Sequence, residues 1–418
     1  MRVAIQTQGS RGDVQPYVAL ACGLLSAGHD VQLAAPEAFS GFVRSHGVSF
    51  APLPGDMLAL IDTPEGKAAI AGGRGFSAGL KLLHRIRPLM RHLLDREWDV
   101  VRSFAPDLIL HHPKSLASPH LAERLSIPAI LASPLPGFTP TTAFPSPLLP
   151  VRSLGPLNRL SHRLAIQAGA MLFGKTIRAW RRGTLALPSS PAGREPSAGT
   201  LYAYSRHLLP VPRDWGDDVL VCGNWFLDGG DWQPPLALRQ FLAAGEPPIH
   251  VGFGSMPGLD PERLTAMVVE ALAKVGRRGL LATGGGALEV GDAAPHVHLI
   301  DDAPHDRLFA HVAASLHHGG AGTTAASLRA GLPTIICPFF GDQPFWARRV
   351  VTLGVGPPSL DRRSLSVAAL ASAFAATADA DMRRRAALLG EAIRGDRGVA
   401  DAIAFITART ALWHACRA

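Results

Sequence analysis

"SLHHGGAGTTAASLRAG", residues 315–331, is the stretch of sequence that decides the fold class of this chain. A short β-type run ends at two histidines, a glycine-rich turn follows, and a run with helical spacing begins directly after the turn. The N-terminus of a helix presents unpaired backbone N–H groups, and glycines at 319, 320 and 322 would let a ligand approach them closely. The pattern therefore predicts strand, turn and helix, with a phosphate or diphosphate at the turn.

The side chains around this turn leave its role open. Thr323 and Thr324 add hydroxyl donors, and His317 or His318 could add a further donor, or a positive charge if protonated. The turn is not a P-loop, because no Gly-Lys-Ser/Thr sequence follows the glycines. From this segment alone, a tight strand-to-helix turn that binds nothing is the alternative interpretation.

Two further segments of the same half favour a ligand site. "GFGSM" (252–256) is a second glycine turn after a β-type run and contains Ser255, and "FFGDQPFW" (339–346) places Asp342 and Gln343 just past another run. Ligands of open α/β sheets bind beyond the carboxyl ends of the strands, so these residues are expected at one edge. A carboxylate and an amide together suit the hydroxyls of a sugar. Diphosphate and sugar together predict a nucleotide sugar.

β-type and helical runs alternate along both halves of the chain. The β-type runs span residues 2–8, 29–36, 106–112, 127–134, 200–205 and 217–223, and then 248–254, 278–284, 296–301, 313–318 and 333–339. This rhythm predicts βαβ units and parallel sheets, hence two α/β halves. The glycines and prolines of "GNWFLDGGDWQPP" (223–235) are typical of an interdomain linker between them.

A carboxylate occupies the first turn of the first half. In "QGSRGDVQPYVAL" (8–20), Asp13 lies between the first β-type run and the first helical run, flanked by Gly9 and Gly12. Asp is a favoured N-cap residue, so a helix N-cap is one interpretation. The other is a general base that takes the proton of an acceptor hydroxyl across an interdomain cleft. Both interpretations can hold together.

The composition is that of a soluble globular protein. A length of 418 residues favours two domains, and 47% hydrophobic with 18% charged residues excludes disordered and fibrous classes. No apolar run is long enough to span a bilayer, and the N-terminus turns polar by residue 6, unlike a signal peptide. Four cysteines show neither metal spacing nor a disulfide framework. We therefore expect a cytoplasmic protein.

Positive charge is concentrated in two segments. The formal net charge is +8, no acidic residue lies between Glu123 and Glu195, and residues 80–94 mix Leu, Ile and Met with Lys and Arg. Such stretches suit a peripheral position at an anionic membrane surface, and a solvated basic face is the alternative. They lack interleaved exposed aromatic residues and no nucleic-acid-reading module is recognisable, so nucleic acid is not an expected partner. The Pro-rich passage 133–150 predicts an ordered loop or a binding lip.

Several stretches together resemble family 1 glycosyltransferases of the GT-B fold, and among these the sterol 3-β-glucosyltransferases and their bacterial relatives. The stretches are "GSRGDVQPYVALA" (9–21), "WFLD" (225–228), "PIHVGFGSMP" (248–257), "IDDAPHDRLF" (300–309) and "HHGGAGTTAASLRAGLPTIICPFFGDQPFWARRVVTLGVGP" (317–357). The resemblance implies two Rossmann-like domains facing each other across a cleft. It implies an acceptor-binding domain at 1–222, a linker at 223–235, a nucleotide-sugar-binding domain at 236–395, and a helix at 396–418 that crosses back to the first domain.

The resemblance also implies the roles of individual residues. Asp13 matches the catalytic base of an inverting transfer, and Asp342 with Gln343 matches the pair that holds the sugar hydroxyls. The positions that match contacts to the donor diphosphate are Ser255, His317, Gly320, Gly322 and Thr323. No cofactor and no metal are implied, and the Asp379-x-Asp381 pattern predicts a helix cap, not a metal site.

We therefore expect an inverting glycosyltransferase that moves a hexose, with glucose foremost, from a UDP-sugar or dTDP-sugar to a hydroxyl of a lipophilic acceptor such as a sterol, hopanoid or polyketide. A nucleotide-sugar hydrolase or epimerase on the same fold is one alternative, and a non-catalytic nucleotide-sugar-binding protein is another. Two departures leave the donor base open: Arg307 stands where sterol enzymes commonly have Trp, and "TGGGA" (283–287) stands where they often have Gly-Trp-Gly.

Overall fold

The computed structural model describes most of the chain. The described residues are 1–56, 76–190, 197–227, 230, 232–254, 256, 260–284, 286–288, 294–301 and 303–417, and within 76–85 only the backbone is described. Ser255 and the apolar and basic side chains at positions 80–85 therefore lie outside what the structure describes.

A seven-stranded parallel sheet forms the first half, in the order β3-β2-β1-β4-β5-β6-β7. Its strands are β1 (Arg2–Gln6), β2 (Asp30–Pro36), β3 (Ser49–Leu53), β4 (Leu108–His111), β5 (Ala129–Ser133), β6 (Ser197–Tyr202) and β7 (Val219–Val221). Sequence analysis did not single out β3, which contains Pro52. A proline is tolerated there because β3 is an edge strand.

A five-stranded parallel sheet forms the second half, in the order β10-β9-β8-β11-β12. Its strands are β8 (Ile249–Gly252), β9 (Gly279–Ala282), β10 (Val297–Ile300), β11 (Ala314–His317) and β12 (Thr334–Ile336). Both sheets reverse their strand order at the first strand, between β1 and β4 and between β8 and β11. Such reversals are where ligands bind in open α/β sheets, beyond the carboxyl ends of the strands.

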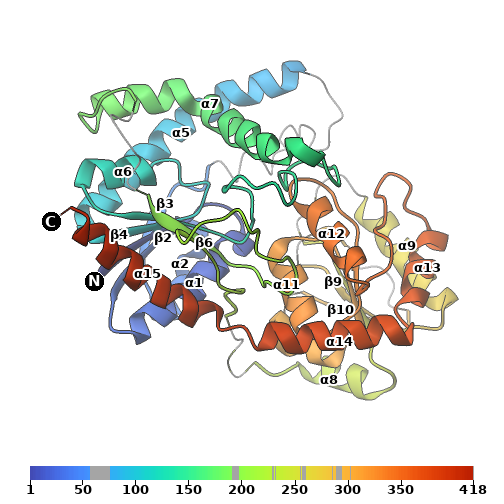
Figure 1. Ribbon diagram of the computed structural model, residues 1–418. Helices are drawn as coiled ribbons and strands as arrows, with labels where there is room; N and C mark the ends of the chain where they lie inside the picture. Colours follow the sequence, from blue (N-terminus) through green and yellow to red (C-terminus); the bar gives the residue numbers. More distant parts are fainter. Residues whose placement is uncertain are drawn as a thin grey trace.

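Helices cover both faces of each sheet (Figure 1). In the first half these are α1 (Arg11–Ser26), α2 (Ser40–Arg44), α5 (Phe76–Phe104), α6 (Ser118–Leu125) and α7 (Asn158–Gly183). In the second they are α8 (Leu236–Ala243), α9 (Pro261–Lys274), α10 (His305–Leu308), α11 (Ala321–Arg329), α12 (Gln343–Thr352), α13 (Val367–Ala376) and α14 (Ala380–Arg394). Asp379 caps α14, where its carboxylate accepts a hydrogen bond from the Met382 backbone at 2.7 Å, as the sequence predicted.

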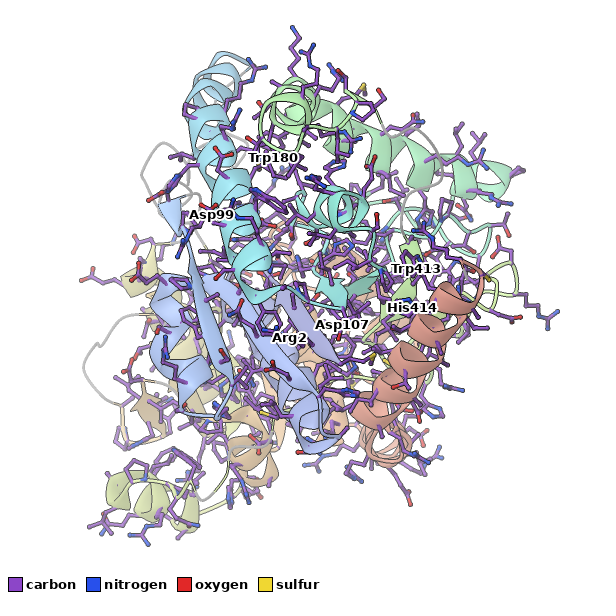
Figure 2. The ribbon with its side chains drawn as sticks, turned by 90° about the vertical axis from the view of Figure 1, so that its left-hand side faces the viewer. Arg2, Asp99, Asp107, Trp180, Trp413 and His414 are labelled. Carbon is purple, nitrogen blue, oxygen red and sulfur yellow. The ribbon has the colours of Figure 1, made fainter. Side chains whose placement is uncertain are left out.

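The last helix, α15 (Gly398–Ala415), packs against α1 and β6 of the first half. Ala402 and Ile406 are fully buried in the same core as Val3 and Ile5 of β1. Figure 1 shows α15 beside α1, and Figure 2 shows Trp413 and His414 near its end. The limits of the domains proposed from the sequence remain predictions.

The opposite face of the first sheet is covered by α5, α6 and α7. Within the segment 80–94, the described apolar side chains of Met90, Leu93 and Leu94 are buried in this core. Ile86 and Leu89 are half-buried and Pro88 is exposed, so only part of the apolar face of this segment is turned away from solvent. No helix among the described residues is long and apolar enough to cross a membrane.

Replacing a buried side chain of α15 is expected to destabilise the first half. Ile406→Ala removes a fully buried side chain, and such substitutions cost about 2–5 kcal/mol. Leu412→Ala on the same helix is the control, because Leu412 is 53% exposed and its loss is expected to change stability by less than about 0.5 kcal/mol. Urea unfolding followed by tryptophan fluorescence measures both, and equal midpoints for the two variants would contradict the packing described here.

Candidate functional site

Asp13 lies in the first turn of α1 and is not its N-cap residue. The N-cap is Ser10, whose backbone is extended, and the Ser10 N–H donates to Asp13 Oδ2 at 2.8 Å. The N-cap interpretation of Asp13 is therefore wrong in its position, although the carboxylate does satisfy a backbone donor of the helix start. This hydrogen bond fixes the carboxylate at the carboxyl end of β1, where the strand order reverses.

Two residues that sequence analysis missed hold the same carboxylate. Lys114 Nζ lies 2.9 Å from Asp13 Oδ2, and His112 Nε2 lies 3.4 Å from Oδ1. Both follow β4, which pairs directly with β1. The only signal in the sequence was a polar "HHPK" immediately after a β-type run.

The tautomer of His112 follows from its hydrogen bonds. The Lys114 backbone N–H donates to His112 Nδ1 at 3.1 Å, so in the neutral ring the proton is on Nε2, facing Asp13. Burial lowers the pKa of His112 to about 4, and the ring is therefore neutral at physiological pH.

Asp13 is held in its ionised form. Burial alone would raise the pKa of this carboxyl, but Lys114, His112 and the hydrogen bond from Ser10 outweigh burial and place the pKa below the usual 3.8. One fifth of the side chain remains exposed, so the carboxylate is accessible. It can accept a proton from a group that enters the gap between the halves.

Gly9 is required by this arrangement. Its φ is +129°, and a Cβ atom there would lie 2.1 Å from Asp13 Oδ2 and 2.8 Å from Lys114 Nζ. Any side chain at position 9 would displace the ion pair, so the glycine keeps the carboxylate and the ammonium group in contact.

In the second half, the glycine turn joins β11 to α11. Gly320 is the N-cap of α11, and no side chain caps this helix end. A Cβ atom at Gly322 would have no neighbour within 4 Å, and Gly322 is exposed. Thr323 is half-buried, and Thr324 is buried with a hydroxyl that has no hydrogen-bond partner. The uncapped backbone N–H groups and the open glycine form a surface that suits an anion.

His317 is a neutral hydrogen-bond donor and not a cation. It is fully buried, and the Gly319 N–H donates to its Nδ1 at 2.9 Å. The proton of the neutral ring is therefore on Nε2, which is buried and has no partner in the described structure. Burial, followed by the neighbouring His318, holds the pKa of His317 well below 6.5, and burial lowers that of His318 to about 4. Of the alternatives weighed for these histidines, the positive charge is excluded at neutral pH.

Asp342 and Gln343 lie past β12 at the start of α12, but much of their hydrogen-bonding capacity is already used. Trp346 Nε1 donates to Asp342 Oδ2 at 2.8 Å. The amide oxygen of Gln343 accepts from the backbone N–H groups of Phe339 at 2.7 Å and Phe340 at 3.2 Å. Gln343 therefore offers a ligand only its NH2 group, which contacts Met256 Sδ at 3.5 Å.

The two halves bring these residues to a shared space. Helix α1 lies against α11. Burial raises the pKa of Asp342, and the negative charge of Asp13 raises it further, whereas Lys114 lowers it. The contact between α1 and α11 brings the first turn of α1, which contains Asp13, to the same side as the helix that follows β11.

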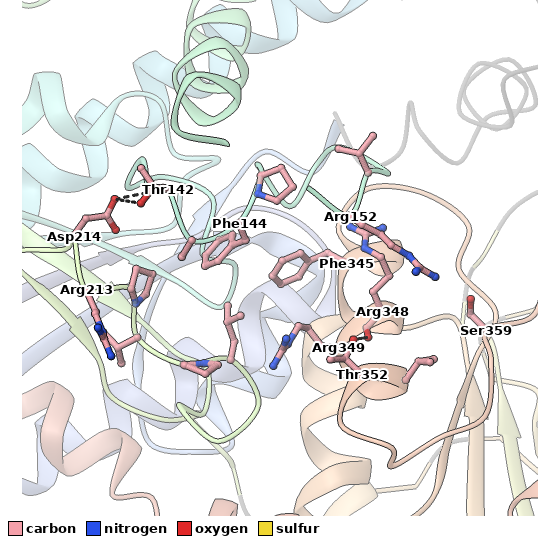
Figure 3. Close-up of a pocket in the computed structure, with 18 of the residues that line it drawn as sticks. Thr142, Phe144, Arg152, Arg213, Asp214, Phe345, Arg348, Arg349, Thr352 and Ser359 are labelled. Carbon is pink, nitrogen blue, oxygen red and sulfur yellow. Dashed lines mark hydrogen bonds between the residues drawn. The ribbon is translucent and has the colours of Figure 1, made fainter. Parts of the chain in front are cut away.

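A cavity lies between the two halves, beside α12 (Figure 3). Its volume is about 950 Å³, with Phe144 and Phe345 among its apolar walls and Arg152, Arg348 and Arg349 among its basic residues. None of the seven described residues that the sequence predicted to form the site lines it. The described residues contain no cluster of His, Cys, Asp and Glu that could hold a metal ion.

Two domain families match the chain in order. Residues 3–144 match the glycosyltransferase family 28 N-terminal domain, and residues 267–394 match the erythromycin biosynthesis protein CIII-like C-terminal domain. A sterol 3-beta-glucosyltransferase of Arabidopsis thaliana is 36% identical over 96% of this chain and 64% of that protein. One of Neosartorya fischeri is 37% identical over 96% of this chain and 29% of that protein. The chain therefore spans only part of the length of either relative.

Solved structures share the fold at low sequence identity. The glycotransferase of kitacinnamycin has a TM-score of 0.72 at 20% identity, covering 98% of this chain and 99% of that one. A Streptomyces sp. SF2575 glycosyltransferase complexed with thymidine diphosphate has a TM-score of 0.63 at 21% identity, covering 97% and 99%. The α/β fold class and the resemblance found in the sequence are confirmed. The two matching domain families, the relatives that align along almost all of this chain and the solved structures together show that this chain has the fold of the GT-B glycosyltransferases.

Proposed function

We propose that this protein transfers glucose from a nucleoside diphosphate sugar to a hydroxyl of a lipophilic acceptor such as a sterol. The observation that carries the proposal is the pairing of an ionised carboxylate, Asp13, with an uncapped helix start and a buried, unpaired donor, His317 Nε2, across the gap between the halves. The names of the curated relatives support a sterol acceptor and glucose as the sugar.

The turn after β11 would hold the donor diphosphate. Negative charge grows on the diphosphate as the bond to the sugar breaks, and the N-terminus of α11 supplies backbone N–H groups and a positive dipole end. His317 Nε2–H would add one neutral donor. Gly322 leaves room for the oxygens to approach the backbone. Ser255 stays a predicted phosphate contact, because it lies outside the described residues.

Asp13 would act as the general base of an inverting displacement. The acceptor oxygen forms a bond to the anomeric carbon, its proton passes to the Asp13 carboxylate, and the bond from that carbon to the diphosphate oxygen breaks, leaving the electron pair on the diphosphate. Asp342 and the NH2 group of Gln343 would hold sugar hydroxyls beside this centre. The residues that follow β1 and β12 thus divide the work between acceptor and sugar.

Lys114 would keep the base charged before the acceptor arrives. Its ammonium group offsets the burial that would otherwise raise the pKa of Asp13. The hydroxyl of the acceptor must reach the same carboxylate, so the side chain of Lys114, which is half exposed, would give up its contact with Asp13 to the incoming oxygen.

The base of the donor nucleotide is the least determined part of the proposal. The relatives' names favour UDP-glucose as donor, and the complex with thymidine diphosphate makes a dTDP-sugar the second donor to test.

We expect the purified protein to form a sterol glucoside from UDP-glucose, measured by mass spectrometry of the lipid fraction, and Asp13→Asn to slow this reaction. General-base catalysis contributes about 10²–10⁴-fold, and transfer is expected to fall by that factor. UDP affinity, measured by calorimetry, should be unchanged in the variant. Release of free glucose at the same rate with or without sterol would instead support a hydrolase.

His317→Ala is expected to weaken UDP binding. A buried hydrogen bond to a charged group contributes about 1.5–3 kcal/mol, so the dissociation constant should rise roughly 10- to 150-fold. The pKa of His317 lies well below 6.5, so the wild-type affinity should not change with pH around that value through this residue. The Asp13→Asn variant serves as the control, and equal UDP affinities for the wild type and His317→Ala would remove His317 from the diphosphate site.

Lys114→Met is expected to move the acidic limb of the pH–rate profile to higher pH. Removing the ammonium group takes away the largest influence that lowers the pKa of Asp13, so burial raises this pKa. In the wild type the base stays ionised above its depressed pKa, and activity is lost as pH falls through it. In the variant this loss should begin at higher pH in kcat/KM. Lys114→Arg keeps the charge and should retain the wild-type profile, and identical profiles for all three proteins would contradict this role.

A further inference from the structure

An exposed apolar surface lies on the segment that leads into α7 and on the middle of α7 itself. Of the fourteen large hydrophobic side chains that are exposed among the described residues, eight fall between positions 148 and 172. They are Leu148, Leu154, Leu157, Leu160, Leu164, Ile166, Met171 and Leu172, and we call them the α7 apolar surface. Scattered exposed leucines need no explanation, but a concentration of this kind is typical of an interaction surface.

The middle of α7 is the most unusual part. In "LAIQAGAML" (164–172), Gln167 is the only polar residue, and every residue except the half-buried Ala165 is exposed. Met171 is 75% exposed and Leu164 is 56% exposed. A helix stretch that is apolar on all sides is ordinarily covered by something.

Both ends of α7 are fixed to the body of the protein by hydrogen bonds, so the middle of the helix is held in place at the surface. At the start, Asn158 donates to the Thr142 carbonyl at 2.9 Å. At the end, Trp180 Nε1 donates to Asp95 of α5 at 3.0 Å, and Figure 2 shows Trp180 between α5 and α7. The Arg181 guanidinium is buried and donates two hydrogen bonds to Glu123, at 2.6 and 3.0 Å.

Basic side chains surround the α7 apolar surface, and acidic ones are absent from this stretch of sequence. The exposed cations are Arg152, Arg159, Arg163, Lys175, Arg178 and Arg182. No Asp or Glu occurs from position 124 to 194. Arg181 is the one arginine of α7 whose charge is neutralised within the protein, by Glu123. The surface is therefore apolar in the middle and positive around it.

This combination selects among the partners that could cover the surface. A second copy of the chain would bring two sets of arginines together, and like charges facing each other oppose association. An anionic bilayer offers acyl chains for the leucines and Met171, and headgroup charge for the arginines and lysine. The segment 80–94 is a weaker match in its described part, because Met90, Leu93 and Leu94 are buried and Ile86 and Leu89 are half-buried.

We propose that the α7 apolar surface is a docking site for the surface of a membrane that contains anionic lipids. The helix lies in the interface, with Leu164 and Met171 among the acyl chains and Arg159 and Arg163 among the headgroups. The proposal does not require the transferase function. If both hold, docking would also bring a lipophilic acceptor to the protein.

Sedimentation with sucrose-loaded vesicles tests the docking directly. The full chain should bind vesicles of phosphatidylcholine with phosphatidylglycerol much more strongly than vesicles of phosphatidylcholine alone, and added salt should weaken this binding. The double variant Leu164→Glu/Met171→Glu should lose at least about tenfold in partitioning, because each apolar side chain taken out of the bilayer loses the corresponding burial. Arg159→Gln and Arg163→Gln should each cost about fivefold on anionic vesicles only.

The matched control is Leu388→Glu/Leu412→Glu, which alters two leucines on α14 and α15 that are 56% and 53% exposed. It should bind vesicles like the wild type. UDP affinity by calorimetry, measured for every variant, separates docking from donor binding and reports whether each variant is folded. Absence of binding to anionic vesicles by the wild type, or equal losses in the control, would overturn the proposal. A wild-type dimer in sedimentation equilibrium that the α7 double variant abolishes would do the same, because a second copy would then cover the surface.

Discussion

The structure depends on a constraint of parallel sheets: all strands of a sheet end at the same edge, and the strand order reverses where the first strand lies. The chain meets this constraint twice. The reversals bring the residues after β1 and β4, and those after β11 and β12, to edges that face each other, and α1 lies against α11. Two separate sheets in this orientation bring a carboxylate and an uncapped helix start to the same region of the protein.

The surroundings of Asp13 and Asp342 shift the pKa values of these two carboxylates in opposite directions. Asp13 has Lys114 and a backbone N–H beside it, which outweigh burial, so its pKa is lowered. Burial raises the pKa of Asp342, and the charge of Asp13 adds to it, which together outweigh the hydrogen bond from Trp346, a backbone hydrogen bond and the charge of Lys114. A group held ionised suits a proton acceptor, and one whose charge is disfavoured suits hydrogen bonds to neutral hydroxyls.

The sequence predicted most of the fold and the main residues of the candidate site, because both follow from local patterns. β-type runs and glycine turns mark the strands and their ends: His317 is the last residue of β11, and Asp13 and Asp342 lie in the segments that follow β1 and β12. Lys114 and His112 could not be predicted as partners of Asp13, because their contact depends on β4 pairing with β1, a matter of strand order and register. Backbone hydrogen bonds determine which groups of Gln343 remain available to a ligand and which nitrogen of His317 carries the proton. The spacing of residues in the sequence does not reveal these bonds.

The packing of α15 on the first half limits how the chain can be divided into fragments that fold. Gly23 of α1 has no room for a Cβ atom, which would lie 2.3 Å from Val399 Cγ1 on α15, so the two helices fit by close backbone approach. A fragment that stops at the linker would leave this contact surface bare to water. Chimeras between related proteins must therefore carry α15 together with the first half that it covers, even though the two are far apart in the sequence.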